Sequence, residues 1–248
     1  MKRSLAAIAV TTIAIAGAAA PAGLGASSND PADANTVISI EGKSASMLSP
    51  DWVAVRKTGT RSVRSSNGET ITISARSVLS QLITANSEMK LRLKWDWFAS
   101  FKAPFVSSIG GVGPKGSNGW NYRVNSLYSA KAANNVNLKV GDRVLWYWGA
   151  MTATVLEIAE PVTGIVPGAV VGPGAFTVTV NEVTWKNTRS PSQGATVTYG
   201  TATATTDANG KATFTPVAGL NTLRVTKAGR IAGTKPLCTL GAPECPGP

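Results

Sequence analysis

Apolar and polar residues alternate along most of the chain with the period of a β-strand, and one segment has helical spacing. The alternation is clearest in residues 91–98 (LRLKWDWF), where Leu and Trp side chains would share one face. Helical spacing occurs in residues 75–86, with Ser74 available as the N-cap. Further strands are expected at 36–40, 52–56, 105–109, 120–124, 143–148 and 153–158, a strand or extended lead-in at 70–74, and a polar loop at 58–68. One helix among short strands predicts an α+β domain, residues 35–160, in which the helix packs on a mixed sheet.

A second, smaller unit is expected after a segment rich in proline and glycine. Residues 161–174 (PVTGIVPGAVVGPG) contain three Pro and four Gly, a density typical of a linker between domains. Alternating segments then recur about every ten residues from 176 to 227, with a tight turn at 207–210 (DANG). This spacing predicts a small all-β sandwich over residues 175–235, followed by an irregular tail, residues 236–248.

The first residues have the pattern of a secretory signal peptide. Lys2 and Arg3 precede a run without charge over residues 5–20, and small-residue cleavage sites are available at 20–22 and 32–34. We expect cleavage in this region, so that residues 1–34 form a signal peptide and disordered leader. The alternative is an uncleaved membrane anchor, for which the apolar run is short. The sequence thus predicts a secreted, extracellular protein without a transmembrane segment in the mature chain, and association with the cell wall is an open alternative to free release.

Two cysteines, Cys238 and Cys245, stand close together near the C-terminal end. In an oxidising compartment such a pair can form a local disulfide, which is our expectation. A metal site is the competing interpretation. It would have to be built from two thiols without any histidine, which is a poor ligand set for zinc.

The chain is strongly basic, with 24 Lys and Arg against 13 Asp and Glu and a formal net charge of +11. Most of the excess lies between Lys43 and Arg143. Such a balance favours anionic partners, among which a cell-wall polymer suits an exported protein better than nucleic acid. A basic surface without a specific partner is the alternative.

Four separated segments resemble the transcobalamin-like C-terminal domain found in exported bacterial proteins. They are the helix SVLSQL (77–82), FVSSIGGV (105–112), GWNYRVNS (119–126) and VGDRVLWYW (140–148). Ser126 departs from the family pattern, which usually has glycine there, so the turn after Asn125 is expected to differ. The resemblance implies a β-grasp-like fold but does not carry cobalamin across, because those carriers hold it against a separate helical barrel. Residues 194–197, 206–214 and 219–229 resemble bacterial immunoglobulin-like or carboxypeptidase-regulatory-like sandwiches, which commonly space or display other domains.

Catalysis is not indicated by the residue inventory. Without histidine, neither a Ser-His-Asp nor a Cys-His arrangement can be assembled. The acids of the first domain stand in turns, loops or solvent-facing positions, and the Gly-rich loop 110–119 lacks a phosphate-binding Gly-Lys-Ser/Thr sequence. We therefore expect neither an enzyme nor a cofactor, with an enzyme of unfamiliar chemistry as the remaining rival.

The aromatic residues are the strongest candidates for ligand contact. Alternation places Tyr147 on the opposite face from Trp146 and Trp148. Burial against the helix is the simplest explanation of Trp120 and Trp146, whereas an exposed Tyr147 could stack on a sugar or planar ligand. The candidate ligand-binding residues are Trp120, Tyr122, Arg123, Asn125, Tyr147 and Trp148.

These observations predict a secreted, non-catalytic binding module for a small molecule or cell-envelope component, presented by a β-sandwich spacer. The alternative is a structural or adhesive surface protein whose basic first domain holds it to anionic wall polymer.

Overall fold

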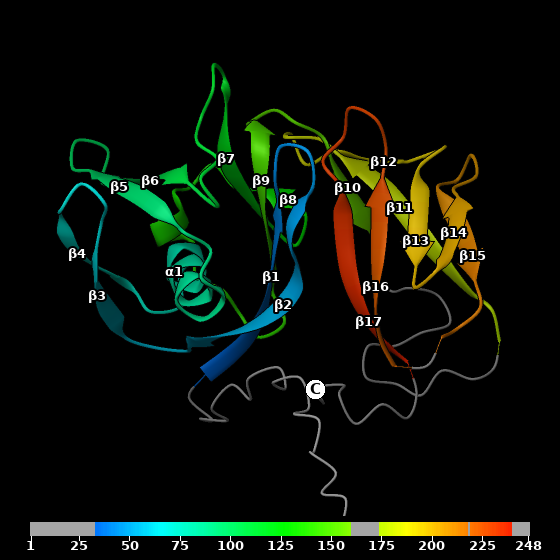
Figure 1. The fold of residues 1–248 in the computed structure, drawn as a ribbon, viewed down its shortest axis with the longest axis horizontal. Coiled ribbons are helices and arrows are strands. Elements are labelled where there is room, and N and C mark those ends of the chain that lie inside the picture. Colours follow the sequence, from blue (N-terminus) through cyan, green and yellow to red (C-terminus); the bar gives the residue numbers. More distant parts are fainter. Residues whose placement is uncertain (1–32, 160–173, 218, 240–248) are drawn as a thin grey trace, which may run out of the picture.

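Two β-rich domains lie side by side in the computed structural model (Figure 1). The structure describes residues 33–159, 174–217 and 219–239. The predicted signal peptide and leader, residues 1–34, lie almost wholly outside these ranges, except that the first strand already begins at Asp33. Within the described ranges, no helix is long and apolar enough to cross a membrane.

The first domain is organised around a mixed five-stranded sheet. Its strands are β1 Asp33–Glu41, β2 Ser46–Arg56, β7 Asn118–Val124, β8 Leu127–Tyr128 and β9 Arg143–Ala150. The order across the sheet is β2-β1-β9-β7-β8, with β1 and β9 parallel and the other neighbours antiparallel. Two hairpins complete the domain, formed by β3 Thr60–Arg64 with β4 Thr70–Ser74 and by β5 Lys94–Phe98 with β6 Ala103–Ser108. The predicted mixed sheet with one helix is therefore present.

The helix α1, Val78–Met89, begins three residues later than its sequence pattern predicts. Ser77, not Ser74, is the N-cap, and its hydroxyl accepts the backbone N–H of Ser80 at 3.2 Å. Ser74 instead ends β4, and its carbonyl accepts from the Ser77 hydroxyl at 2.9 Å. The helix ends at Lys90, which adopts a left-handed conformation with φ 55°. Four apolar helix residues are fully buried against the sheet: Val78, Leu79, Leu82 and Ala85.

The predicted apolar face of residues 91–98 is confirmed, because all its members pack on the first core: Leu91, Leu93, Trp95 and Trp97. The polar loop predicted over 58–68 is wrong, since β3 lies within it and pairs with β4. Val63 is the buried apolar residue of β3, whose pattern TRSVR is otherwise polar. A single inward apolar side chain is too weak a signal to mark a strand.

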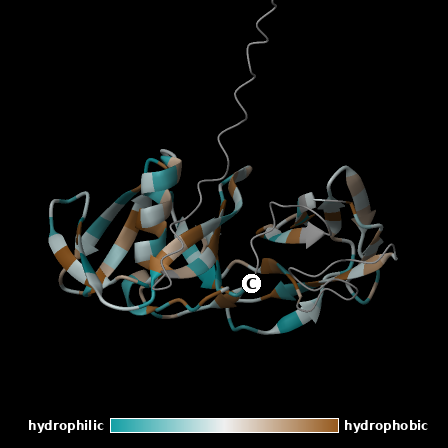
Figure 2. Ribbon diagram, turned by 90° about the horizontal axis from the view of Figure 1, so that it is seen from below, coloured by the Kyte–Doolittle hydropathy of each residue, from teal (hydrophilic) through white to brown (hydrophobic). Residues whose placement is uncertain are grey.

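The second domain consists of two four-stranded sheets that enclose one apolar core. One sheet contains β10 Val155–Ile158, β11 Phe176–Val183, β12 Arg189–Pro191 and β15 Lys211–Phe214. The other has the order β14-β13-β16-β17, with β13 Thr196–Tyr199, β14 Ala202–Thr205, β16 Gly219–Thr226 and β17 Gly233–Thr239. Figure 2 shows hydrophobic and hydrophilic residues alternating along the strands of both domains, as expected where each strand has one inward face.

The domain boundary lies earlier in the chain than predicted. Strand β10 was expected to end the first domain, but it pairs with β11, and its Leu156 and Ile158 belong to the second core. Residues 151–154 therefore join the domains. The predicted linker 161–174, most of which lies outside the described ranges, instead connects two adjacent antiparallel strands of one sheet. Proline and glycine are as typical of such connections as of linkers, so composition could not distinguish them.

The second domain also extends further than its predicted end at residue 235. Strand β17 continues to Thr239, so residues 236–239 are not part of an irregular tail. Pro236 is accommodated because β17 is at the edge of its sheet, where a missing N–H is tolerated. The backbone of Cys238 pairs with Leu220 in this edge, whereas Cys245, its predicted disulfide partner, lies outside the described ranges.

Apolar, ionic and hydrogen-bonded contacts join the domains. A buried apolar cluster at the junction comprises Tyr147, Val155 and Val183. Both terminal nitrogens of Arg224 in the second domain donate hydrogen bonds to the carboxylate of Glu41 in the first, at 2.7 and 2.9 Å. Nearby, the backbone N–H of Tyr128 donates to the side chain of Asn187 at 2.7 Å, and Asn187 donates back to the Tyr128 carbonyl at 3.2 Å.

Candidate functional site

The six candidate residues do not form a single site. Two line a groove in the first domain, two are buried where the domains meet, one lies in a turn and one lines a cleft between the domains. Trp120 and Tyr122 line the groove, and Arg123 and Tyr147 are the buried pair. Asn125 lies in the turn, and Trp148 lines the cleft.

The aromatic groove is a depression of about 280 Å³ formed by β6, β7, β8, β9 and the segment 129–133. We define it by six side chains: Phe105, Trp120, Tyr122, Tyr128, Trp146 and Met151. Trp120 and Trp146 are almost fully buried and form its floor, whereas Phe105 and Met151 are 44% and 49% exposed and form its rim. Strand alternation explains this arrangement, because residues two apart on neighbouring strands face the same side.

The two floor indoles differ in hydrogen bonding. Trp120 Nε1 donates to the Val112 carbonyl at 2.7 Å. Trp146 Nε1 has no acceptor among the described residues, although the side chain is only 2% exposed. Leaving a buried donor unpaired costs about 1–3 kcal/mol.

Tyr122 holds the segment 129–133 against the groove. Its hydroxyl donates to the Lys131 carbonyl at 2.5 Å, and its ring lies 5.4 Å from that of Trp146 with an interplanar angle of 40°. Burial raises the pKa of Tyr122 more than its contact with the Ser129 hydroxyl lowers it, so the phenol remains protonated at neutral pH. Among the described residues that line the groove, Lys131 is the one cation and no acid is present. The groove is therefore aromatic and nearly uncharged.

Arg123 and Tyr147 are fully buried. Tyr147 is therefore not available for the surface stacking considered from the sequence, and Arg123 does not offer a surface contact to a ligand. Tyr147 does face away from Trp146, as alternation predicts, but the second domain covers it. Arg123 donates to the carbonyls of Thr184 at 3.0 Å and Ala153 at 2.8 Å, which joins β7 to the second domain. Both residues thus have a structural position at the domain junction.

Asn125 shapes the turn between β7 and β8. Asn125 and Ser126 have φ angles of 50° and 67°, as in the tight turns that favour hairpins. The Asn125 side chain donates to Asp142 at 2.8 Å and accepts the backbone N–H of Arg143 at 2.9 Å. These bonds stabilise the left-handed backbone at Asn125. The next residue is Ser126, where the resembling family usually has glycine, and the turn forms with serine in that place.

Phe105, Tyr128, Trp146 and Met151 were not recognised from the sequence as groove residues, and Trp146 was assigned to burial against the helix. Each lies on a different segment, and the contact that brings β6 beside β7 leaves no local signal in the sequence. The exposure of Phe105, which marks it as a binding candidate, is known only from the structure. Among the described residues, no three potential metal ligands lie together.

Comparison with known proteins relates part of the chain to a family of unknown role. Residues 87–150 match a family described as Domain of unknown function (DUF4430). The match covers three of the four segments that carry the resemblance, and it ends at the last residue of β9. Nearly all residues that line the aromatic groove fall inside it. No curated protein matches the chain.

Proposed function

We propose that this protein is an exported, non-catalytic binding module whose aromatic groove takes a neutral ring-shaped ligand, such as one sugar residue of an envelope glycan. The first domain would be a β-grasp-like, transcobalamin-like unit and the second an immunoglobulin-like spacer. The signal-peptide pattern of residues 1–34 supports export, and the resemblance of segments 77–148 supports the assignment of the first domain.

The ring-lined groove with its exposed rim is the observation that carries this proposal. Its aromatic side chains offer apolar contact to the face of a ligand, and Lys131 is the one cation among the described lining residues. A neutral sugar fits this lining, because its C–H face packs on rings and it brings no charge into the groove. The volume of about 280 Å³ is small for a ligand pocket and suits a single ring rather than a large cofactor.

The proposal can be tested by NMR titration of the mature protein with a soluble N-acetylglucosamine tetramer and with soluble peptidoglycan fragments. The Trp146 indole resonance, assigned through Trp146→Phe, should shift on binding because a ligand on the groove changes the surroundings of this floor ring. The indole of Trp185, which is 41% exposed in the second domain, should not shift. Binding that leaves the Trp146 resonance in place would reject the groove as the site.

A pair of matched variants gives a second readout. Phe105→Ser removes a rim ring and should weaken binding roughly two- to tenfold, the value of one aromatic contact. Phe101→Ser removes an equally apolar ring that is 78% exposed and outside the groove, so it should have no effect. Equal losses in the two variants would mean that the ligand contacts a general apolar surface.

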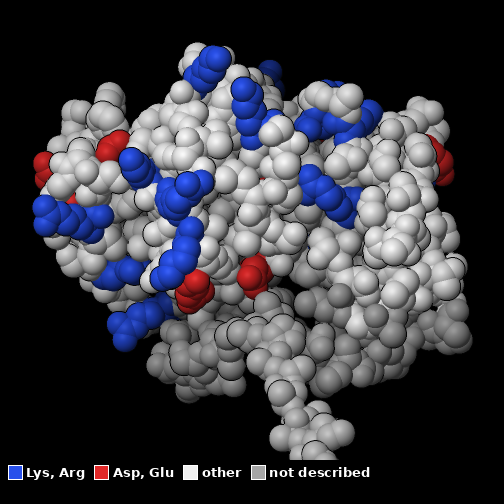
Figure 3. All heavy atoms as spheres, viewed as in Figure 1, with Lys and Arg blue, Asp and Glu red and all other residues white. Residues whose placement is uncertain are grey.

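A second candidate function follows from the charge distribution. On the face shown in Figure 3, Lys and Arg side chains outnumber Asp and Glu and lie mainly over the first domain and its junction with the second. This supports an adhesive surface protein held to anionic wall polymer. Release of the protein from isolated cell walls by high salt would favour this function, since salt screens surface charge.

A further inference from the structure

A second depression, separate from the aromatic groove, lies between the two domains. We call it the interdomain cleft; its volume is about 520 Å³, and it shares no lining residue with the groove. The turn between β1 and β2 forms one wall, and β16 with the β16–β17 turn forms the other. Its charged and aromatic lining residues are Glu41, Lys43, Trp148, Arg224, Lys227 and Arg230.

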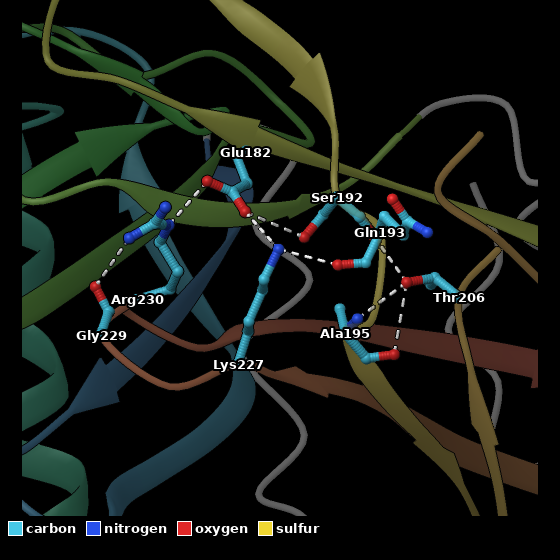
Figure 4. Close-up of polar contacts among 8 residues, drawn as sticks. All are labelled: Glu182, Ser192, Gln193, Ala195, Thr206, Lys227, Gly229 and Arg230. Carbon is cyan, nitrogen blue, oxygen red and sulfur yellow. Dashed lines mark hydrogen bonds and ion pairs between the residues drawn. The ribbon is translucent and has the colours of Figure 1, made fainter. Parts of the chain in front are cut away.

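Ion pairs hold three of the four cations in place without exhausting their donors. Arg224 uses two of its five N–H groups on Glu41. Lys227 donates to Glu182 and to the Gln193 carbonyl, both at 2.8 Å, which leaves one ammonium hydrogen. Arg230 donates through Nε to Glu182 at 2.6 Å and through Nη1 to its neighbouring carbonyl at 3.3 Å (Figure 4). The acids thus orient the cations, and each cation keeps donors for another anion.

Lys43 is the cation of the cleft without an acidic partner among the described residues. Its ammonium lies 5.7 Å from the centre of the Trp148 ring, a cation–π contact. The indole is itself fixed, because Trp148 Nε1 donates to the Gly113 carbonyl at 3.1 Å. Four cations therefore surround the cleft against two acids, Glu41 and Glu182, which leaves an excess positive charge.

We propose that the interdomain cleft binds a phosphate group, as a phosphomonoester or as a phosphodiester of an anionic polymer. Side chains with guanidinium and ammonium groups line the cleft from both domains, and phosphate offers acceptor oxygens in several directions. Donors that are already positioned lose little conformational freedom when they bind. This site is independent of the aromatic groove, so either proposal can fail without the other.

The test is calorimetric titration of the mature two-domain protein with four probes: inorganic phosphate, glycerol 3-phosphate, poly(glycerol phosphate) and polygalacturonate. We expect a phosphate-bearing probe to bind and its affinity to fall steeply between about 50 and about 500 mM NaCl. Binding of glycerol 3-phosphate identifies a free phosphate ester as the ligand, and binding of poly(glycerol phosphate) alone identifies a polymer. Equal affinity for polygalacturonate would overturn the selectivity for phosphate.

Two lysine variants separate the cleft from general surface charge. Lys43→Gln should weaken binding roughly three- to tenfold, because it removes the unpaired cation of the cleft. Lys186→Gln removes the same charge from a comparable contact in the second domain, where Nζ lies 5.4 Å from the centre of the Trp185 ring. This control should bind like the unchanged protein. Equal weakening in both variants, or no binding of any phosphate probe, would refute the proposal.

Discussion

Replacement of Arg123 by methionine tests whether this buried cation joins the domains or serves a ligand. Arg123 is fully buried on β7, and its guanidinium donates to carbonyls of residues that belong to the junction and the second domain. The Cζ atom of Arg123 also lies 5.6 Å from the centre of the Tyr128 ring, a cation–π contact. Methionine fills a similar volume without a charge or a donor, so the variant removes these interactions and leaves little cavity.

The expected loss of stability can be worked out from the acceptors. Hydrogen bonds from a charged donor contribute about 1.5–3 kcal/mol each. The Thr184 carbonyl retains a second donor, the backbone N–H of Asn187 at 3.0 Å, whereas the Ala153 carbonyl loses its donor. An unpaired buried carbonyl costs about 1–3 kcal/mol, and removal of a buried charge offsets part of the remaining loss. We therefore expect Arg123→Met to lower the free energy of unfolding by about 1–3 kcal/mol.

Urea unfolding measures this loss, and hydrogen exchange locates it. Exchange should accelerate in residues 151–154 and 184–187, the segments that Arg123 contacts. Arg92→Met is the matched control, since Arg92 also donates to a carbonyl, that of Gly110 at 2.8 Å, but from an exposed position. The control should change stability by less than about 0.5 kcal/mol. Equal stability of the two variants, or loss of ligand binding in Arg123→Met without loss of stability, would refute the structural role.

Three further predictions concern the second domain and the cysteines. Burial raises the pKa of Glu182, but hydrogen bonds and charges from its two cationic partners hold it below the ordinary value. The stability it contributes is therefore present above about pH 4.3 and lost as the pH falls further, so Glu182→Gln should flatten the pH dependence of unfolding in that acidic range. Gly210→Ala places a Cβ against the backbone carbonyl oxygen of Val180 at φ 73° and should lower the melting temperature clearly more than Gly116→Ala, where φ is 61° and the space is open. If Cys238 and Cys245 form a disulfide, mass spectrometry of the protein purified under non-reducing conditions will show a mass two hydrogens lower and no alkylation before reduction.

The alternation of apolar and polar residues predicted most of the strands, because each strand packs one face on a core and its pattern can be read from neighbouring residues alone. The faces of 91–98 and the opposite orientations of Trp146 and Tyr147 follow from a period of two residues and are found in the structure. Strand β3 was missed because its pattern contains one inward apolar residue, Val63. The end of β17 was missed because Pro236 suggested irregular backbone, which an edge strand tolerates.

The candidate site was less predictable, because it depends on contacts between distant segments. The sequence identified Trp120 and Tyr122, but not that Phe105 and Met151 would form the rim beside them. Nor does Arg123 differ locally from a surface arginine. Its burial results from the second domain packing against β7, and nothing in the residues around position 123 records that contact.

The family match and the domain junction together separate the two proposed sites. The match ends at Ala150, immediately before the junction 151–154, which agrees with a domain boundary there rather than at 161–174. It contains nearly all of the groove, whereas the interdomain cleft also needs strand β16 and the β16–β17 turn of the second domain. A protein with the first domain alone would therefore keep the groove and lose the cleft. The groove thus lies almost wholly within the part of the chain that the family model matches, whereas the proposed phosphate site depends on both domains.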